Sequence, residues 1–142
     1  MLIPHVVSTE ADKVFVNILN NQSSALSDGD LVCWNTSSPD GVRTTQPSTN
    51  ILSLFVGVAD GAIAASAYGL AQAYGYKSTV AVINSDTVAI AAGDILVPVN
   101  AADYAKRSAA SDGKTGFLFA GAAVATDTTP AATTAKGFIR AL

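Results

Sequence analysis

Short apolar runs alternate with glycine and Asp-Gly breaks along most of the chain. The runs LVCW at 31–34, ILSLFVGVA at 51–59 and ILVPV at 95–99 are rich in β-branched and aromatic residues. Asp-Gly and Gly-Asp pairs stand beside these runs, and glycine supplies the positive φ that a tight turn requires. Apolar runs of this length between turn residues are typical of β-strands. The pattern therefore predicts an all-β chain.

The alanine-rich segment 62–67, near the centre of the chain, could also be interpreted as a helix. Glycines flank it closely, and an isolated helix shorter than about 12–15 residues is marginal in water. We therefore predict two strands beyond it, at about 68–76 and 78–84, with Lys77 near the bend.

Three tyrosines, Tyr68, Tyr74 and Tyr76, occur within this region and share parity. In one unbroken strand they would line one face, because successive side chains alternate across a strand. A bulge at Gly75 would break that register. These tyrosines either pack within a subunit or between subunits, or they line a groove in which their rings stack on sugars.

A turn followed by a strand occurs twice in similar form. Residues 27–32 and 91–96 each place Gly-Asp directly before an apolar run. The segment 100–108 is either a short helix, for which Asn100 is a suitable N-cap and Asp103 stands at the third position, or a long loop. Further strands are predicted at 116–124 and 137–142.

These segments amount to about eight short strands and at most one short helix near 100–108. The expected fold is a single small β-barrel or β-tulip, because a closed barrel removes exposed strand edges. The run VFVNIL at 14–19 is either an ordinary first strand or part of an arm that pairs with a neighbour. We expect residues 1–27 to form this N-terminal strand or arm and residues 28–142 to form the barrel domain.

Charge is scarce in the chain. Charged residues make up 13% of the 142 residues, about half of the usual share. The net charge of −3 argues against nonspecific nucleic-acid binding, which requires clustered cations. Alanine supplies 26 residues of an apolar fraction of 49%, so large core side chains are few and oligomerisation is favoured. No run has the length and side-chain size of a transmembrane helix, so we expect no membrane partner.

Groups that perform catalysis are sparse. His5 is the single histidine and Cys33 the single cysteine, and no feature of the sequence orients them as a nucleophilic pair. Zinc usually takes three or four ligands from Cys and His, and the residues after Asp28 and Asp30 lack calcium-loop spacing. We expect no enzymatic activity, no metal and no cofactor. A small hydrolase that uses Cys33 is the alternative from the enzyme class.

The order of turns and strands resembles the small decoration (cement) proteins of tailed-phage capsids. The likeness covers about residues 28–99 well and 114–142 loosely. The motifs that carry it are Val56-Gly57-Val58, the segment from Gly69 to Gly75, Gly93-Asp94-Ile95-Leu96 and the opening Gly29-Asp30-Leu31-Val32.

The resemblance implies a homotrimer that binds the major capsid protein on the outer surface of a phage head and stabilises it. Such a protein is made in the host cytoplasm, resides in the virion and has no enzymatic activity. The alternative is a head-fibre or tail-associated module that binds host glycans. The residues that we expect at interfaces are Val14, Phe15, Val16, Tyr68, Tyr74 and Tyr76.

Overall fold

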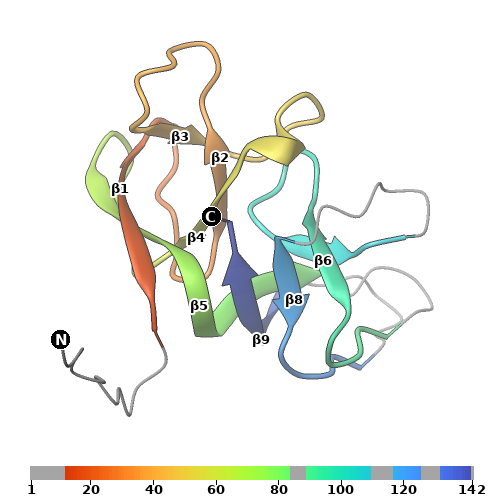
Figure 1. The fold of residues 1–142 in the computed structure, drawn as a ribbon. Helices are drawn as coiled ribbons and strands as arrows, with labels where there is room; N and C mark the ends of the chain where they lie inside the picture. The colour runs from red at the N-terminus through yellow and green to blue at the C-terminus, as the bar shows by residue number, and fades with distance from the viewer. Residues whose placement is uncertain (1–11, 84–88, 110–116, 126–131, 142) are drawn as a thin grey trace, which may run out of the picture.

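The computed structural model of the chain describes residues 12–83, 89–109, 117–125 and 132–141, and these are all-β (Figure 1). Nine strands form one sheet, which confirms the predicted all-β, barrel-like fold. A short 3₁₀ turn, η1 (Leu52–Leu54), is the single helical element among the described residues. The strands are β1 (Val14–Asn20), β2 (Leu31–Trp34), β3 (Arg43–Thr45), β4 (Phe55–Ala59), β5 (Tyr68–Ile83), β6 (Ile95–Pro98), β7 (Ala105–Arg107), β8 (Leu118–Ala120) and β9 (Ala132–Arg140).

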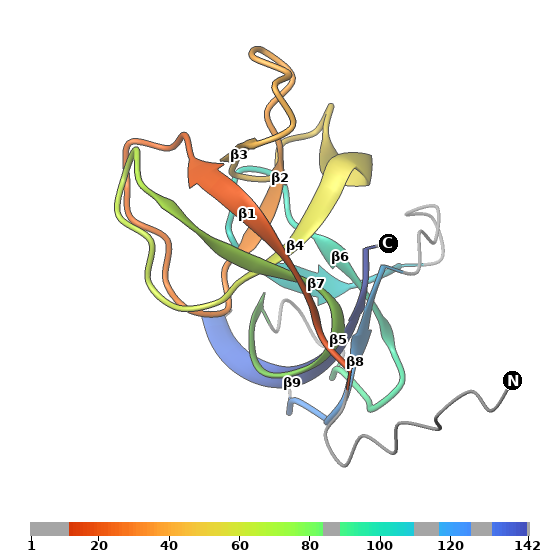
Figure 2. The ribbon, with the colours of Figure 1, turned by 60° about the vertical axis from the view of Figure 1, so that its left-hand side comes forward.

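The sheet closes on itself twice. Its strand order is β1-β3-β2-β4-β5-β7-β6-β8-β9, and β5 also pairs with β1 and with β9. Strands β1 to β5 therefore form a first circuit, strands β5 to β9 form a second, and β5 belongs to both. Figure 1 shows β5 passing from beside β1 to beside β9, and Figure 2 shows β1 lying along the first part of β5.

The two circuits share one plan. In each, the first strand pairs parallel with the third and antiparallel with the fifth, and the remaining pairs are antiparallel. The turns that the sequence repeats lie at the same place, before β2 and before β6. The carboxylate of Asp30 accepts the N–H of Ser27 at 2.7 Å, and that of Asp94 accepts the N–H of Ala91 at 2.8 Å. The repeated sequence pattern therefore corresponds to a repeated structure.

Two apolar clusters stabilise the circuits. The first contains Val32 and Val56 and lies within the first circuit, whereas the second contains Leu31 and Val58 and extends into the second circuit. Strands β2 and β4 are buried on both faces because successive side chains point into different clusters. A strand buried on both faces reads as an unbroken apolar run, as LVCW and FVGVA do.

Strand β5 is one strand of 16 residues, where the sequence predicts two. Its ladder with β9 shifts register between Lys77 and Val80, so the expected bend is a bulge inside a continuous strand. The buried amide of Gln72 donates to the carbonyl oxygens of Tyr74 and Tyr76, both at 3.1 Å. This side chain thus satisfies backbone acceptors where β5 crosses from one circuit to the other.

The helix considered for 100–108 does not form. Residues 100–104 are turns and bends, and β7 follows them. The carboxylate of Asp103 accepts hydrogen bonds from the side chains of Gln22 at 3.3 Å and Gln46 at 3.0 Å. These contacts tie the loop to the first circuit, so Asp103 serves long-range contacts instead of a helix N-terminus.

The predicted first strand is β1, which pairs with both β3 and β5 within the sheet. The part of the expected arm at residues 1–11 lies outside the described residues. The division into an N-terminal segment and a barrel domain stays a prediction.

An ion-pair cluster fixes the first circuit against the bulge of β5. The Lys77 ammonium donates to Asp28 at 2.8 Å and to Asp60 at 2.9 Å, and the lysine side chain is only 6% exposed. Burial alone would raise the pKa of Asp28, but the hydrogen bonds from Lys77 and from the N–H of Gly61 together lower it. Burial would likewise lower the pKa of Lys77, whereas the two carboxylates raise it.

We predict that Lys77→Met lowers the free energy of unfolding by about 1–2 kcal/mol. This is below the cost for a fully buried pair, because Asp28 and Asp60 are 44% and 42% exposed. The ion pair contributes fully above the ordinary Asp pKa of 3.8 and is lost as the pH falls through the lower folded value. Urea unfolding should therefore show that the free energy of unfolding falls less in the variant than in the wild type between about pH 5 and about pH 3.

Lys136→Met is the matched control, since Lys136 is exposed on β9. An equal loss of stability in both variants would contradict the structural role of Lys77.

Glycine is required at the centre of β4 by a close approach of backbones. A Cβ at Gly57 would overlap the carbonyl oxygen of Gln72 on β5 and lie 2.9 Å from its carbonyl carbon. Neither atom belongs to a flexible side chain, so the two strands would have to separate.

We predict that Gly57→Ala lowers the free energy of unfolding by about 2–3 kcal/mol, as overpacking does in a rigid core. Gly41→Ala is the control, because Gly41 has a φ of +74° and nothing within 4 Å of an added Cβ. That substitution should cost about 1 kcal/mol, from backbone strain alone. Equal thermal unfolding midpoints for the two variants would show that β4 and β5 are not tightly apposed.

Candidate interaction surface

An aromatic surface extends across four adjacent strands, β1, β5, β9 and β8. In their ladders, Val14 lies opposite Tyr74, Tyr76 opposite Phe138, and Phe138 opposite Phe119. Directly opposed residues in a sheet point to the same face. These five residues are termed the seam surface, because β5 passes here from the first circuit to the second.

The seam surface is open to solvent and ordered by its own contacts. Val14, Tyr76 and Phe138 are 40%, 37% and 39% exposed. The rings of Tyr74 and Phe138 meet edge to face, with centroids 5.4 Å apart and an interplanar angle of 78°. Such a pair stabilises by about 0.5–1.5 kcal/mol beyond its area. Side chains held in this way lose little conformational freedom when a partner covers them.

Gly75 does not break the register of the neighbouring tyrosines. The β5–β9 ladder runs from Tyr74 to Tyr76 without a shift, so both side chains lie on one face. Gly75 has a φ of +101°, and a Cβ there would overlap the carbonyl oxygen of Asp12. Glycine at this position therefore allows the chain before β1 to approach β5 closely beneath the seam surface.

Three of the six predicted interface residues belong to the seam surface. Phe15 lies beside it, 40% exposed and opposite the buried Gln72. Tyr68 is 73% exposed but lies at the far end of the ladder, opposite Leu19. Val16 is half-buried and packs against the first cluster, so it faces inward.

Sequence reasoning missed Phe119 and Phe138 as members of this surface. Both fall in predicted strands, and nothing in their local spacing distinguishes them from core residues. The signal that unites them is the pairing of Phe119 with Phe138 and of Phe138 with Tyr76, and Tyr76 and Phe138 stand about sixty residues apart in the chain.

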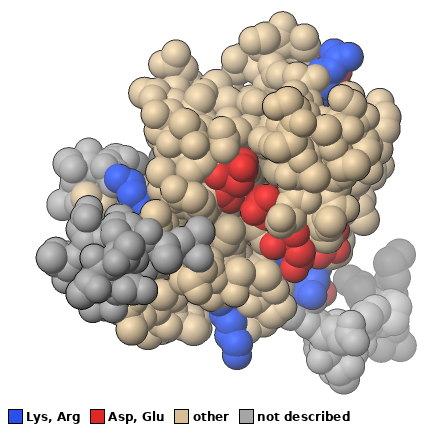
Figure 3. All heavy atoms as spheres, turned by 180° about the vertical axis from the view of Figure 1, so that it is seen from behind, with Lys and Arg blue, Asp and Glu red and all other residues tan. Residues whose placement is uncertain are grey.

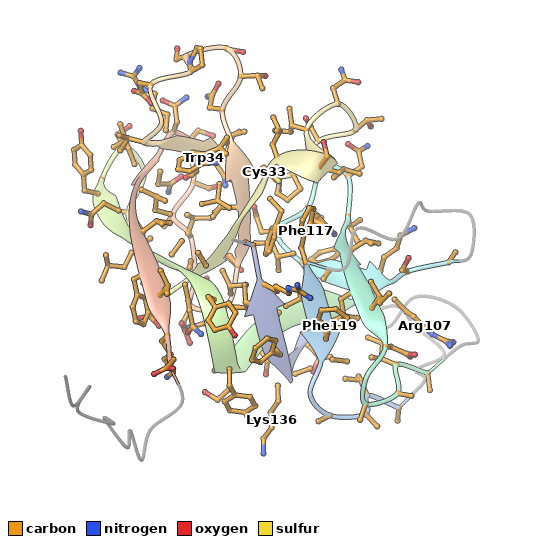
Figure 4. All side chains as sticks on the ribbon, viewed as in Figure 1. Cys33, Trp34, Arg107, Phe117, Phe119 and Lys136 are labelled. Carbon is orange, nitrogen blue, oxygen red and sulfur yellow. The ribbon has the colours of Figure 1, made fainter. Side chains whose placement is uncertain are left out.

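Charged groups lie mainly elsewhere. Acidic side chains gather in a strip on the face opposite the view of Figure 1 (Figure 3). Burial raises the pKa of Asp30, and the nearby charges of Asp103 and Asp28 raise it further. Figure 4 shows the side chain of Lys136 pointing away from the body below β9. Arg140 is the exception, because it is exposed and lies opposite Tyr74 in the β5–β9 ladder, so a partner on the seam surface would meet aromatic groups bordered by a cation.

Metal-ligating side chains are not assembled in the described ranges. Within residues 12–83, 89–109, 117–125 and 132–141, no group of three or more His, Cys, Asp or Glu is placed to hold a metal. Asp28 and Asp30, considered as the start of a calcium loop, are bonded to Lys77 and to backbone N–H groups of turns. His5, considered with Cys33 as a nucleophilic pair, lies outside the described residues.

A scan against protein-family models finds no match for the chain, and a search of curated proteins finds none either. In the part of the chain that the structure describes, no helix has the length and apolar character needed to cross a bilayer.

Cys33 is fully buried in the second cluster, and burial raises the pKa of its thiol to about 12. Because the thiolate is the reactive species, we predict that the native protein resists iodoacetamide at about pH 8. The same protein in guanidinium should gain one adduct, measured by intact mass spectrometry. Rapid stoichiometric labelling of the native protein would contradict this burial.

Proposed function

We propose that this chain is a structural virion protein that decorates the outer surface of a tailed-phage capsid and stabilises it. Its partners are the major capsid protein and two further copies of itself, and it acts without catalysis, nucleic acid or membrane. It is made in the host cytoplasm and resides on the capsid exterior. The observation that carries the proposal is the seam surface.

An exposed apolar patch that spans several strands is typical of a protein–protein contact. Aromatic residues are enriched in such contacts, and charged residues are depleted at their centres. The seam surface is rich in aromatic residues, since four of its five members are aromatic, and the charged Arg140 lies at its border opposite Tyr74. A contact of this kind supports a protein that holds other proteins together.

The two closed circuits support the same role. Closure gives β1 and β9 a partner strand on each side, although β3 pairs only with Leu19 and Asn20 of β1. A body whose strands β2 and β4 are buried on both faces suits a load-resisting part, because local opening would expose two clusters at once.

The resemblance to decoration proteins adds support of a different kind. Two of the motifs that carry it, Gly29-Asp30 and Gly93-Asp94, are the turns that begin β2 and β6. The motif Val56-Gly57-Val58 contains Gly57, where the close approach of β4 and β5 leaves no room for a Cβ. The resemblance therefore rests on residues that organise the two circuits.

We predict that the wild-type protein is a trimer by size-exclusion chromatography with light scattering. It should also bind undecorated capsids of the phage that encodes it and raise their melting temperature. The double variant Tyr76→Ser/Phe138→Ser should weaken one or both associations at least about tenfold, because two large apolar contacts are lost.

Tyr68→Ser is the control, since this tyrosine is the more exposed residue and lies off the seam surface. A monomer that leaves capsid melting unchanged would contradict the proposal, as would equal effects of the control and the double variant. Electron cryomicroscopy of phage particles distinguishes decoration from the alternative role. Density over the whole shell supports decoration, and density at one vertex or on the tail supports a head-fibre or tail module.

A further inference from the structure

A groove with a different chemistry lies at the end of β2, away from the seam strands. It has a volume of about 270 Å³ and lies between the β2–β3 loop and η1. Figure 4 marks the position of Trp34 at this end of the molecule. The residues that line the groove include Trp34, Asn35, Thr36, Pro39, Arg43 and Leu54. It is termed the Trp34 groove.

The loop that forms one wall is fixed by its own side chains. Asn35 Oδ1 accepts the N–H of Ser37 at 2.8 Å, and Asp40 Oδ1 accepts the N–H of Val42 at 3.0 Å and that of Arg43 at 2.8 Å. The N–H of Asn35 donates to the carbonyl of Arg43 at 2.9 Å, which closes the base of the loop. The wall is therefore formed before any ligand arrives, which lowers the entropic cost of binding.

The apolar part of the groove comes from three side chains. Trp34 packs partly against the first cluster and partly lines the groove, so its indole is held in place by the core. Leu54 is 37% exposed on η1, and Pro39 belongs to the loop. An indole anchored in this way offers a rigid flat surface with a polar N–H.

The polar part of the groove carries no net charge. The Arg43 guanidinium pairs with the Asp40 carboxylate at 3.0 Å, and both groups belong to the same loop. Asn35 and Thr36 add amide and hydroxyl groups at the rim. An apolar surface with a few placed polar groups is typical of a small-molecule site, and the balanced charge favours an uncharged ligand.

From this combination we propose that the Trp34 groove binds one pyranose unit of a neutral glycan. The C–H face of the sugar ring packs on the indole and on Leu54, while its hydroxyl groups meet the amide, hydroxyl and guanidinium groups of the rim. A groove of this size fits a single ring better than an extended peptide, which needs a longer track. The site is separate from the seam surface and does not depend on capsid decoration.

The chain contains a single tryptophan, so its fluorescence reports on this groove directly. The wild-type protein is titrated with methyl α-D-glucopyranoside, methyl α-D-mannopyranoside, methyl β-D-galactopyranoside and N-acetyl-D-glucosamine. At least one of these sugars should shift the emission in a saturable way, with Kd in the millimolar range. Amide resonances of residues 34–43 and Leu54 should move during the same titration.

Leu54→Ala and Leu70→Ala form a matched pair, since Leu54 and Leu70 are 37% and 42% exposed on different elements. Leu54→Ala should raise Kd about fivefold, from the apolar contact that it removes. Leu70→Ala should leave Kd within about twofold of the wild-type value.

Three results would contradict the proposed sugar site. The first is that none of the four sugars gives a saturable response. The second is that the responding resonances lie outside the groove or that Leu70→Ala weakens binding as much as Leu54→Ala does. The third is that a proline-rich peptide saturates the tryptophan signal and the sugars do not. All three are independent of whether the protein binds capsids.

Discussion

The structure depends on a single strand that serves two closed circuits. Strand β5 pairs with β1 and β4 along its first part and with β9 and β7 along its second. A strand cannot change partners on both sides without breaking its ladders locally. The break is accommodated by Gly75, by the bulge after Lys77 and by the Gln72 amide that satisfies two carbonyl groups. Lys77 then holds the first circuit against the bulge through two carboxylates.

This arrangement also determines where the molecule can meet a partner. The seam surface lies where β5 changes circuits, and its residues come from strands of both circuits. The inner face at this point is occupied by Ile139, which is fully buried. Because successive side chains of a strand alternate across the sheet, the neighbouring Phe138 lies on the outer face. An exposed aromatic surface is thus a consequence of how the crossing is built as well as a place for a partner.

Much of the fold follows from local sequence, and the limits of that inference have a physical cause. Turn residues and short apolar runs predict the all-β class, and the repeated Gly-Asp turn marks the start of β2 and of β6. A bulge and a turn both use glycine, which is why the sequence around Gly75 predicts a bend near Lys77 where β5 in fact continues. Asp103 suggests a helix start, but its partners Gln22 and Gln46 are distant in the chain. Contacts of this kind are set by tertiary structure, which local propensity does not encode.

The two candidate surfaces differ in how far sequence alone reveals them. Tyr74 and Tyr76 are visible as a pair by parity, whereas Phe138 joins them only through the β5–β9 ladder. The Trp34 groove is less visible still, because it combines a strand end, a loop fixed by Asn35 and Asp40, and Leu54 from η1. The hydrogen bonds of Asn35 and Asp40 fix that loop, and the residues of the seam surface do not take part in them. The two proposed sites are therefore built from separate sets of residues, and we expect binding at one to leave the geometry of the other unchanged.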